Sequence, residues 1–139
     1  MFIQKTFDEL KIGMKDSISK TISQDVIQGF ANVSEDTNPL HFDQEFAKTT
    51  VFGRCIAHGM ISAALISAVL GTKMPGIGSV YLKQELIFKA PVYVDDVLTA
   101  YAEIIELDEV KKRVKLATWC ETQGGIKVVD GSATMMFNH

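Results

Sequence analysis

The chain has 139 residues, of which 47% are apolar, and its formal net charge is −3 at pH 7. This length predicts a single domain, residues 1–139, with enough apolar side chains for a substantial core. The mildly acidic balance argues against a nucleic-acid-binding surface, which requires clustered Lys and Arg to meet the phosphates. The first ten residues lack the apolar core of a signal peptide, so a cytoplasmic location is expected.

The amino-terminal segment is predicted to form one short strand and one amphipathic helix. Residues 16–21 alternate weakly, as a short strand does. Ser23 is suited to cap a helix that ends near Ser34. Apolar residues three and four apart then make one buried stripe on this helix: Val26, Ile27, Phe30, Ala31 and Val33.

The following segment 34–41, Ser-Glu-Asp-Thr-Asn-Pro-Leu-His, is predicted to be a structured loop. Pro39 lacks an amide hydrogen and biases Asn38 toward an extended conformation. A turn there would bring the carboxylate of Asp36 and the imidazole of His41 together, as a base and an acid around one water molecule. The alternative is that Asp36 and Asn38 only form a turn, and that His41 only caps a helix or lies in solvent.

Two further helices are expected. Asp43 is suited to cap one or two turns through Ala47. Residues 55–72 contain no Asp, Glu, Lys or Arg, so a helix over 59–70 has no polar face and must be covered on every side. At about 1.5 Å per residue this helix reaches roughly 18 Å, too short for a hydrocarbon slab of about 30 Å. No membrane span is therefore expected, and a sheet should wrap around the helix instead.

The amino end of this apolar helix is the second candidate for chemistry. The amide of Gly59 has no intrahelical partner there and suits a developing oxyanion. The alternative is that glycine merely eases a tight turn into the helix. Cys55 and His58 resemble half of a zinc site, but no second pair of Cys or His accompanies them, so no metal is predicted.

After the Pro- and Gly-rich segment 74–78, four long strands are predicted over about 80–89, 97–107, 113–122 and 126–137. In the first of them, one set of side chains shares a face, while Tyr81 points the other way. That set is Val80, Leu82, Leu86 and Phe88. Small residues two apart in later strands would let the sheet approach a helix closely: Ala100 with Ala102, and Gly131 with Ala133.

A strand, then helices, then four antiparallel strands is the layout of an α+β hotdog fold, in which a curved antiparallel sheet wraps around a central apolar helix. The edges of such a sheet are free to pair with another chain. A homodimer, or an oligomer built from dimers, is therefore expected.

Two motifs carry a resemblance to a known family. The loop 34–41 and the sequence Gly-Arg-Cys-Ile-Ala-His-Gly-Met at 53–60 resemble the linked signature of the (R)-specific enoyl-CoA hydratases, the MaoC-like hotdog dehydratases. The similarity extends from about residue 23 to residue 137. It implies reversible hydration of trans-2-enoyl-CoA to (R)-3-hydroxyacyl-CoA, with no cofactor because the CoA thioester is itself the substrate.

The resemblance also implies roles for individual residues. Asp36 and His41 would hold the catalytic water, and Asn38 and Pro39 would shape their loop. The amide of Gly59 would receive the thioester oxygen.

Three more positions bear on this comparison. Ser67 matches a serine near the acyl pocket, although it could equally be a buried hydroxyl bonded to its own helix. Glu35 stands where glycine is commonest and is expected to point to solvent. Cys55 replaces the usual proline, which is expected to loosen the loop before the helix.

Several alternatives stay open at this stage. The substrate could be carried by acyl carrier protein rather than CoA, and the same fold serves acyl-CoA thioesterases and non-catalytic acyl-thioester binding subunits. Arg54, Lys83 and Lys89 are candidates for binding either the CoA phosphates or the acidic helix of a carrier protein. The acyl chain length depends on how side chains of the central helix and the closing strand plug the tunnel, and bulky residues near Ser67 and Leu70 would indicate short acyl chains.

Overall fold

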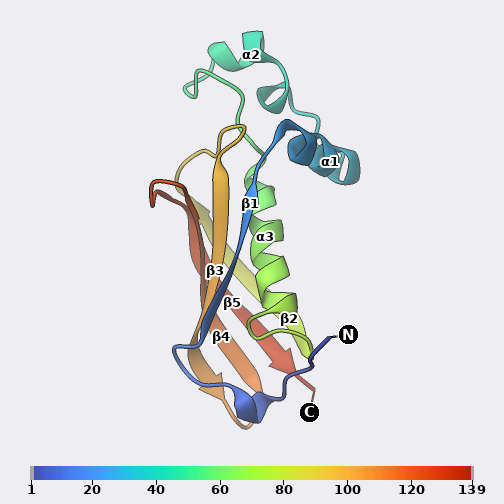
Figure 1. Ribbon diagram of the computed structural model, residues 1–139, viewed down its shortest axis with the longest axis vertical. Helices are drawn as coiled ribbons and strands as arrows, with labels where there is room; N and C mark the ends of the chain where they lie inside the picture. The colour runs from blue at the N-terminus through green and yellow to red at the C-terminus, as the bar shows by residue number, and fades with distance from the viewer. Residues whose placement is uncertain (1, 139) are drawn as a thin grey trace.

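The computed structural model describes residues 2–138. Five antiparallel strands form one curved sheet in the order β1-β3-β4-β5-β2 (Figure 1). The strands are β1 (Lys15–Thr21), β2 (Ser79–Phe88), β3 (Val97–Asp108), β4 (Arg113–Thr122) and β5 (Lys127–Phe137). The predicted fold class is confirmed, and each strand begins and ends within one residue of its expected bounds.

The central helix α3 (Gly59–Thr72) lies along the sheet and packs mainly against β3 (Figure 1). Its buried side chains include Ile66, Val69 and Leu70, which have no exposed surface. Ala100 and Ala102 of β3 are also fully buried in the core shared with the helix. The helix therefore approaches the sheet over small side chains, as predicted for this strand. Within residues 2–138, the helices all fall short of the length and hydropathy needed to span a bilayer.

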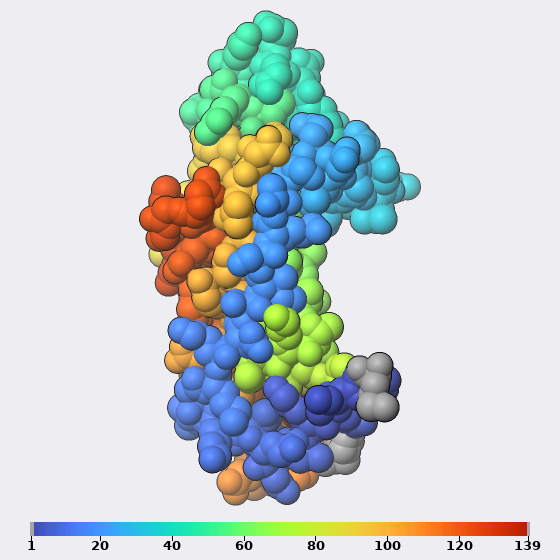
Figure 2. Space-filling view, viewed as in Figure 1, coloured from blue at the N-terminus to red at the C-terminus, as the bar shows by residue number. Residues whose placement is uncertain are grey.

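One face of α3 is not covered by the chain, which corrects the expectation of complete cover. Met60, Ala64, Ser67 and Gly71, spaced three and four apart, are all exposed. The reason is that the sheet ends at β2 without curling past the helix. In Figure 2, atoms of α3 (green) form part of the surface between α1 (Gln24–Ser34) and the amino-terminal segment. The result is an apolar stripe on the surface of the single chain.

Strand β2 departs from simple alternation at a bulge. Its register with β5 shifts between Tyr81 and Lys83, and the extra residue at Leu82 reverses the side-chain alternation. Tyr81 therefore lies on the same side as Phe88, and both line one cavity beside α3. The prediction that Tyr81 points away was wrong. The predicted inward residues Val80 and Leu82 are 42% and 44% exposed.

Gly131 of β5 serves a close approach of a different kind from the one predicted. A Cβ at this position would overlap the backbone of Glu85 in the neighbouring strand β2. The missing side chain therefore allows close contact between two strands rather than between the sheet and α3.

Helices α1 (Gln24–Ser34) and α2 (Gln44–Lys48) lie together at one end of the sheet, beyond the strand ends (Figure 1). Two 3₁₀ turns, η1 (Phe7–Glu9) and η2 (Pro39–His41), complete the chain. Ser23 caps α1 as predicted, because its side chain accepts a hydrogen bond from the amide of Val26 at 3.3 Å.

The predicted apolar stripe of α1 is buried only in part. Ile27 and Ala31 are 0% and 2% exposed, whereas Val33 is 82% exposed. The inclusion of Val33 was wrong because the carboxyl end of α1 projects beyond the sheet (Figure 1). A helical stripe predicts burial only where another element lies beneath it.

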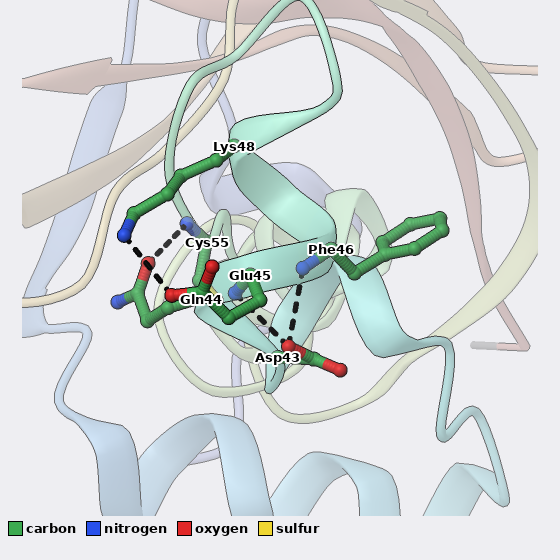
Figure 3. A network of polar contacts seen from close by, with 6 residues as sticks. All are labelled: Asp43, Gln44, Glu45, Phe46, Lys48 and Cys55. Atoms are coloured by element: carbon green, nitrogen blue, oxygen red, sulfur yellow. Dashed lines mark hydrogen bonds and ion pairs between the residues drawn. The ribbon is translucent and has the colours of Figure 1, made fainter.

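Helix α2 is hydrogen-bonded to the segment that leads to α3, at Cys55 (Figure 3). Asp43 caps it as predicted, accepting hydrogen bonds from the amides of Glu45 and Phe46 at 3.0 and 3.1 Å. The side-chain oxygen of Gln44 accepts a hydrogen bond from the amide of Cys55 at 3.4 Å. A proline at position 55 has no amide hydrogen and would not form this bond. Cys55 thus gains a tether that offsets the looseness expected from losing proline.

Candidate active site

The loop between α1 and η2 is a tight turn held by its own polar groups. The carboxylate of Asp36 accepts a hydrogen bond from the amide of Asn38 at 3.2 Å, and the Asn38 side chain accepts one from the amide of Leu40 at 2.9 Å. Pro39 occupies the first position of η2, where a missing amide hydrogen costs nothing. Asn38 therefore caps this turn with its side chain and Pro39 begins it.

This turn brings together the two side chains that were predicted to act on one water. Asp36, His41 and a third residue, His58, each offer a nitrogen or oxygen atom, and these atoms all lie within 4.8 Å of one another. The carboxylate is exposed, whereas both imidazoles are buried. A carboxylate and an imidazole at this separation are close enough to contact a single water molecule.

The orientation of the His41 ring is fixed by the backbone. Its Nδ1 lies 2.7 Å from the carbonyl oxygen of Ile56. Because a carbonyl only accepts, Nδ1 carries the hydrogen, and in the neutral ring Nε2 keeps its lone pair. Burial lowers the pKa of His41 below its usual 6.5, and His58 lowers it further, while the hydrogen bond to Ile56 and the carboxylate of Asp36 act in the opposite direction. The site therefore favours a neutral His41.

Gly59 is the first residue of α3, so its amide is one of the four that lack an intrahelical partner. It lines a cavity of about 260 Å³ together with His58, Phe88 and Lys89. Its backbone is not in the left-handed region, so the turn itself does not require glycine. A Cβ at this position would lie 3.0 Å from two ring atoms of Phe88. Close approach of that ring, rather than a tight turn, is what glycine accommodates.

Ser67 lies apart from the Asp36 and His41 pair. It lines a second cavity of about 480 Å³ with Tyr81 and Gln84, and Phe88 borders both cavities. Ser67 is exposed in the single chain. The alternative that it is a buried hydroxyl is therefore wrong.

The three basic candidates for binding the substrate carrier differ in their surroundings. The guanidinium of Arg54 lies 3.7 Å from the ring centroid of Tyr93 and lines a cleft of about 480 Å³. Lys89 borders the cavity of Gly59. Lys83 pairs with Glu85 at 3.3 Å on the exposed surface. The cleft of Arg54 and the cavity of Gly59 meet at Ala90 and Pro91, which line both.

His58 is the site residue that sequence reasoning missed, because it was considered only as half of a zinc site. Its Nε2 lies 2.8 Å from the carbonyl oxygen of Asp36, and its ring centroid lies 3.8 Å from that of His41. The available signal was a histidine directly before Gly59 in a segment otherwise free of charge. Among the residues that the structure describes, Asp36, His41 and His58 are also the one group that could hold a metal ion.

Residues 8–124 match the family model for the MaoC like domain. The chain belongs to the MaoC-like family. The resemblance found in the two sequence motifs is thereby confirmed.

Known proteins similar to this chain align with nearly its whole length. An (R)-specific enoyl-CoA hydratase of Rhodospirillum rubrum is 48% identical over 94% of this chain and 90% of its own length. A 3-hydroxybutyryl-CoA dehydratase of Methylorubrum extorquens is 43% identical over 91% of this chain and 80% of its own. The solved structure of an (R)-hydratase from A. caviae involved in PHA biosynthesis matches with a TM-score of 0.88 at 46% identity, covering 92% of this chain and 97% of its own.

Proposed function

We propose that this protein catalyses the reversible hydration of trans-2-enoyl-CoA to (R)-3-hydroxyacyl-CoA. The observation that carries the proposal is the convergence of the Asp36 carboxylate and the His41 imidazole, within 4.8 Å, on a loop beside the amino end of α3. The relatives named as an (R)-specific enoyl-CoA hydratase and a 3-hydroxybutyryl-CoA dehydratase support both the reaction and the thioester substrate.

Activation of the water molecule is assigned to Asp36 and His41. Asp36 is the exposed carboxylate and accepts a proton from the water as its oxygen attacks C3 of the enoyl thioester. His41, held through Nδ1 by Ile56, directs the lone pair of Nε2 at the same water and orients it, and the pair then passes the proton taken from the water on to C2. The water oxygen ends on C3 and one hydrogen on C2, so the addition balances without a cofactor. Dehydration is the same path in reverse.

Stabilisation of the intermediate is assigned to Gly59. Attack at C3 places negative charge on the thioester oxygen as an enolate, and the free amide of Gly59 lies at the positive end of the α3 dipole. Loss of one such donor typically costs about 3 kcal/mol of transition-state stabilisation. The cavity beside Gly59 gives the thioester access to this amide.

The two neighbouring cavities suggest how the rest of the substrate lies. The apolar cavity that contains Ser67 is suited to the acyl chain, since most of its lining is hydrocarbon. The Arg54 cleft, which meets the Gly59 cavity at Ala90 and Pro91, is suited to phosphates of CoA. Lys83 is assigned no role in carrier binding, because it is paired with Glu85 on the exposed surface.

Acyl carrier protein is the alternative carrier. The acidic helix of the carrier protein could bind Arg54 in the same way as the phosphates of CoA. The two carriers must therefore be compared directly. Equal kcat/KM values for crotonyl-CoA and crotonyl-[acyl carrier protein] would show that the protein does not discriminate. Preference for CoA that disappears in Arg54→Ala would support the phosphate site.

A homodimer is part of the proposal. The uncovered stripe of α3 includes Met60, which is 57% exposed, and Phe88 of the adjacent edge strand β2, which is 51% exposed, borders the same cavity. A second copy placed against this face would bury both apolar surfaces and would close the cavity that contains Ser67. Sedimentation equilibrium at micromolar concentration tests this: a mass near twice 15.3 kDa is expected, and a monomer at all concentrations would contradict it.

Hydration of crotonyl-CoA tests the proposed activity. Loss of the enoyl absorbance is followed at saturating substrate, and the configuration of the product is assigned with (R)- and (S)-specific 3-hydroxyacyl-CoA dehydrogenases. Formation of the (R) product supports the proposal. Release of free thiol without 3-hydroxyacyl-CoA would indicate a thioesterase, and tight binding without turnover would indicate a non-catalytic subunit.

A further inference from the structure

The position of His58 is not explained by its place at the start of a helix. It is the N-cap residue of α3, with φ −59° and ψ 132°, yet its side chain makes no capping hydrogen bond. The ring turns toward the loop that follows α1 and lies against Phe30 and Phe42, at centroid distances of 5.0 and 6.0 Å. Only 3% of the residue is exposed. A polar ring is thus buried where an apolar side chain would pack more easily.

This buried ring contacts both members of the proposed catalytic pair. Its Nε2 donates a hydrogen bond to the backbone carbonyl oxygen of Asp36 at 2.8 Å. Its face lies on the ring of His41, with centroids 3.8 Å apart and planes inclined by 31°. Its Nδ1 is buried and has no hydrogen-bond partner within residues 2–138. One side chain therefore touches the backbone of the base and the ring of its partner.

The remaining hydrogen bonds of Asp36 are local. Its amide donates to the hydroxyl of Ser34 at 3.2 Å, and its carboxylate accepts from the amide of Asn38 at 3.2 Å. For the described residues, the bond from His58 is the one that links Asp36 to a residue distant in sequence. The preceding residue, Glu35, is in the left-handed region at φ 64°, a conformation that this side chain does not favour. The position of the Asp36 backbone, and with it that of the carboxylate, thus depends on the hydrogen bond from His58.

We propose that His58 is a positioning residue for the hydration reaction. It sets the separation between the Asp36 carboxylate and the His41 ring. Because it directly precedes Gly59, it also fixes the position of that pair relative to the oxyanion donor. The inference rests on the function proposed above. Its physical basis is that a displacement of about 1 Å between reacting groups costs on the order of 10²-fold in rate.

Two substitutions separate positioning from core packing. In His58→Gln, the side-chain amide can still donate to the Asp36 carbonyl, whereas His58→Leu fills a similar volume and has no donor. Positioning predicts that His58→Leu lowers kcat by about 10- to 100-fold with KM changed less than about threefold, while His58→Gln keeps kcat within about threefold. A role in packing alone predicts the opposite order, because an amide is harder to bury than leucine.

The pH profile supplies a readout that packing would not move. Burial is the main cause that lowers the pKa of His41, and the titratable groups facing this ring are His58, which lowers that pKa further, and Asp36, which raises it. Both variants lose the contribution of His58. The acid limb of kcat/KM is therefore expected to move to higher pH in both, while the burial of His41 keeps it below that of free histidine.

The outcomes are distinct from those that test the function itself. A wild-type protein that does not hydrate enoyl thioesters contradicts the proposed function. An active wild type whose His58→Leu variant turns over as fast as His58→Gln, with an unmoved acid limb, overturns the role of His58 alone. Thermal unfolding of both variants is measured alongside, and if His58→Leu does not fold, a kcat of His58→Gln more than about tenfold below that of wild type, although the donor to Asp36 is kept, overturns the inference by itself.

Discussion

The Nδ1 of His41 lies 2.7 Å from the carbonyl oxygen of Ile56, three residues before the start of α3. This bond joins the loop after α1 to the segment before the central helix, so the imidazole and the Gly59 amide are held by one continuous piece of backbone. It also fixes which ring nitrogen faces the proposed water. The geometry of the site thus depends on a contact between two segments that the sequence separates by α2.

The lowered pKa of His41 leads to a prediction on pH dependence. Burial, the main cause, moves the pKa below 6.5, so His41 stays neutral at pH values where free histidine becomes charged. The acid limb of kcat/KM is expected below pH 6.5. Since the unfolded chain binds the proton more readily, stability should be fully present above the unfolded pKa and should fall as pH drops through the folded pKa. Thermal melts of wild type and His41→Gln across pH 5–8 check this, and equal slopes would contradict it.

Removal of the proposed base provides the second prediction. Asp36→Asn keeps the size of the side chain and its hydrogen bond from the Asn38 amide, but it no longer accepts a proton at neutral pH. We expect kcat for crotonyl-CoA to fall by about 10²- to 10⁴-fold. The matched control is Glu35→Gln, which neutralises the adjacent exposed carboxylate and should leave turnover within about twofold. Equal losses in both variants would point to a general charge effect instead.

Local patterns accounted for most of the secondary structure. The strand ends were predicted within one residue, because alternation and turn residues such as the glycines at 124 and 125 act over a few positions. The ends of α1 and the caps Ser23 and Asp43 were found for the same reason. Helix α3 continues to Thr72, two residues past its predicted end at Leu70. A single glycine at position 71 does not stop a helix that is packed along one side.

Features that depend on tertiary contacts were not predicted. The bulge at Leu82 turns Tyr81 inward, and this follows from the pairing of β2 with β5 rather than from any residue type. The exposed stripe of α3 depends on where the sheet ends. The place of His58 was hidden because its partner is the backbone of Asp36, 22 residues away. Backbone acceptors leave no mark in the sequence.

The backbone of Glu35 gives a third prediction, on stability. This residue ends α1 with φ 64°, in the left-handed region, which explains why glycine is favoured at the position. Glu35 is exposed, as expected. Glu35→Gly should relieve the strain at some cost in chain entropy, for a net gain of about 0.5–1 kcal/mol and a rise in Tm of roughly 2–4 °C. Glu35→Ala removes the same charge but keeps the strain, so a similar rise in that variant would contradict the explanation.

Chelation tests whether the cluster at the site holds a metal. Asp36, His41 and His58 place suitable atoms within 4.8 Å, yet the proposed reaction uses the first two as an acid–base pair and needs no Lewis acid. Exhaustive dialysis against EDTA is therefore expected to leave kcat and KM for crotonyl-CoA unchanged. Loss of activity that Zn²⁺ restores would contradict this and would assign the three residues to a metal centre.

The role of the Gly59 amide leads to the last prediction, which depends on a comparison of proline with alanine. Gly59 occupies the first helical position, where proline fits the backbone and removes only the N–H, and the ψ of 132° at His58 is compatible with a following proline. Both Gly59→Pro and Gly59→Ala add a Cβ against Phe88, which would lie 3.0 Å away, so the crowding is similar in the two variants. Only the proline variant loses the proposed donor. We expect its kcat to be about 10²-fold below that of Gly59→Ala, the loss associated with one oxyanion donor of about 3 kcal/mol. Stopped-flow hydration of crotonyl-CoA measures both values, and equal kcat in the two variants would mean that the thioester oxygen does not bind this amide.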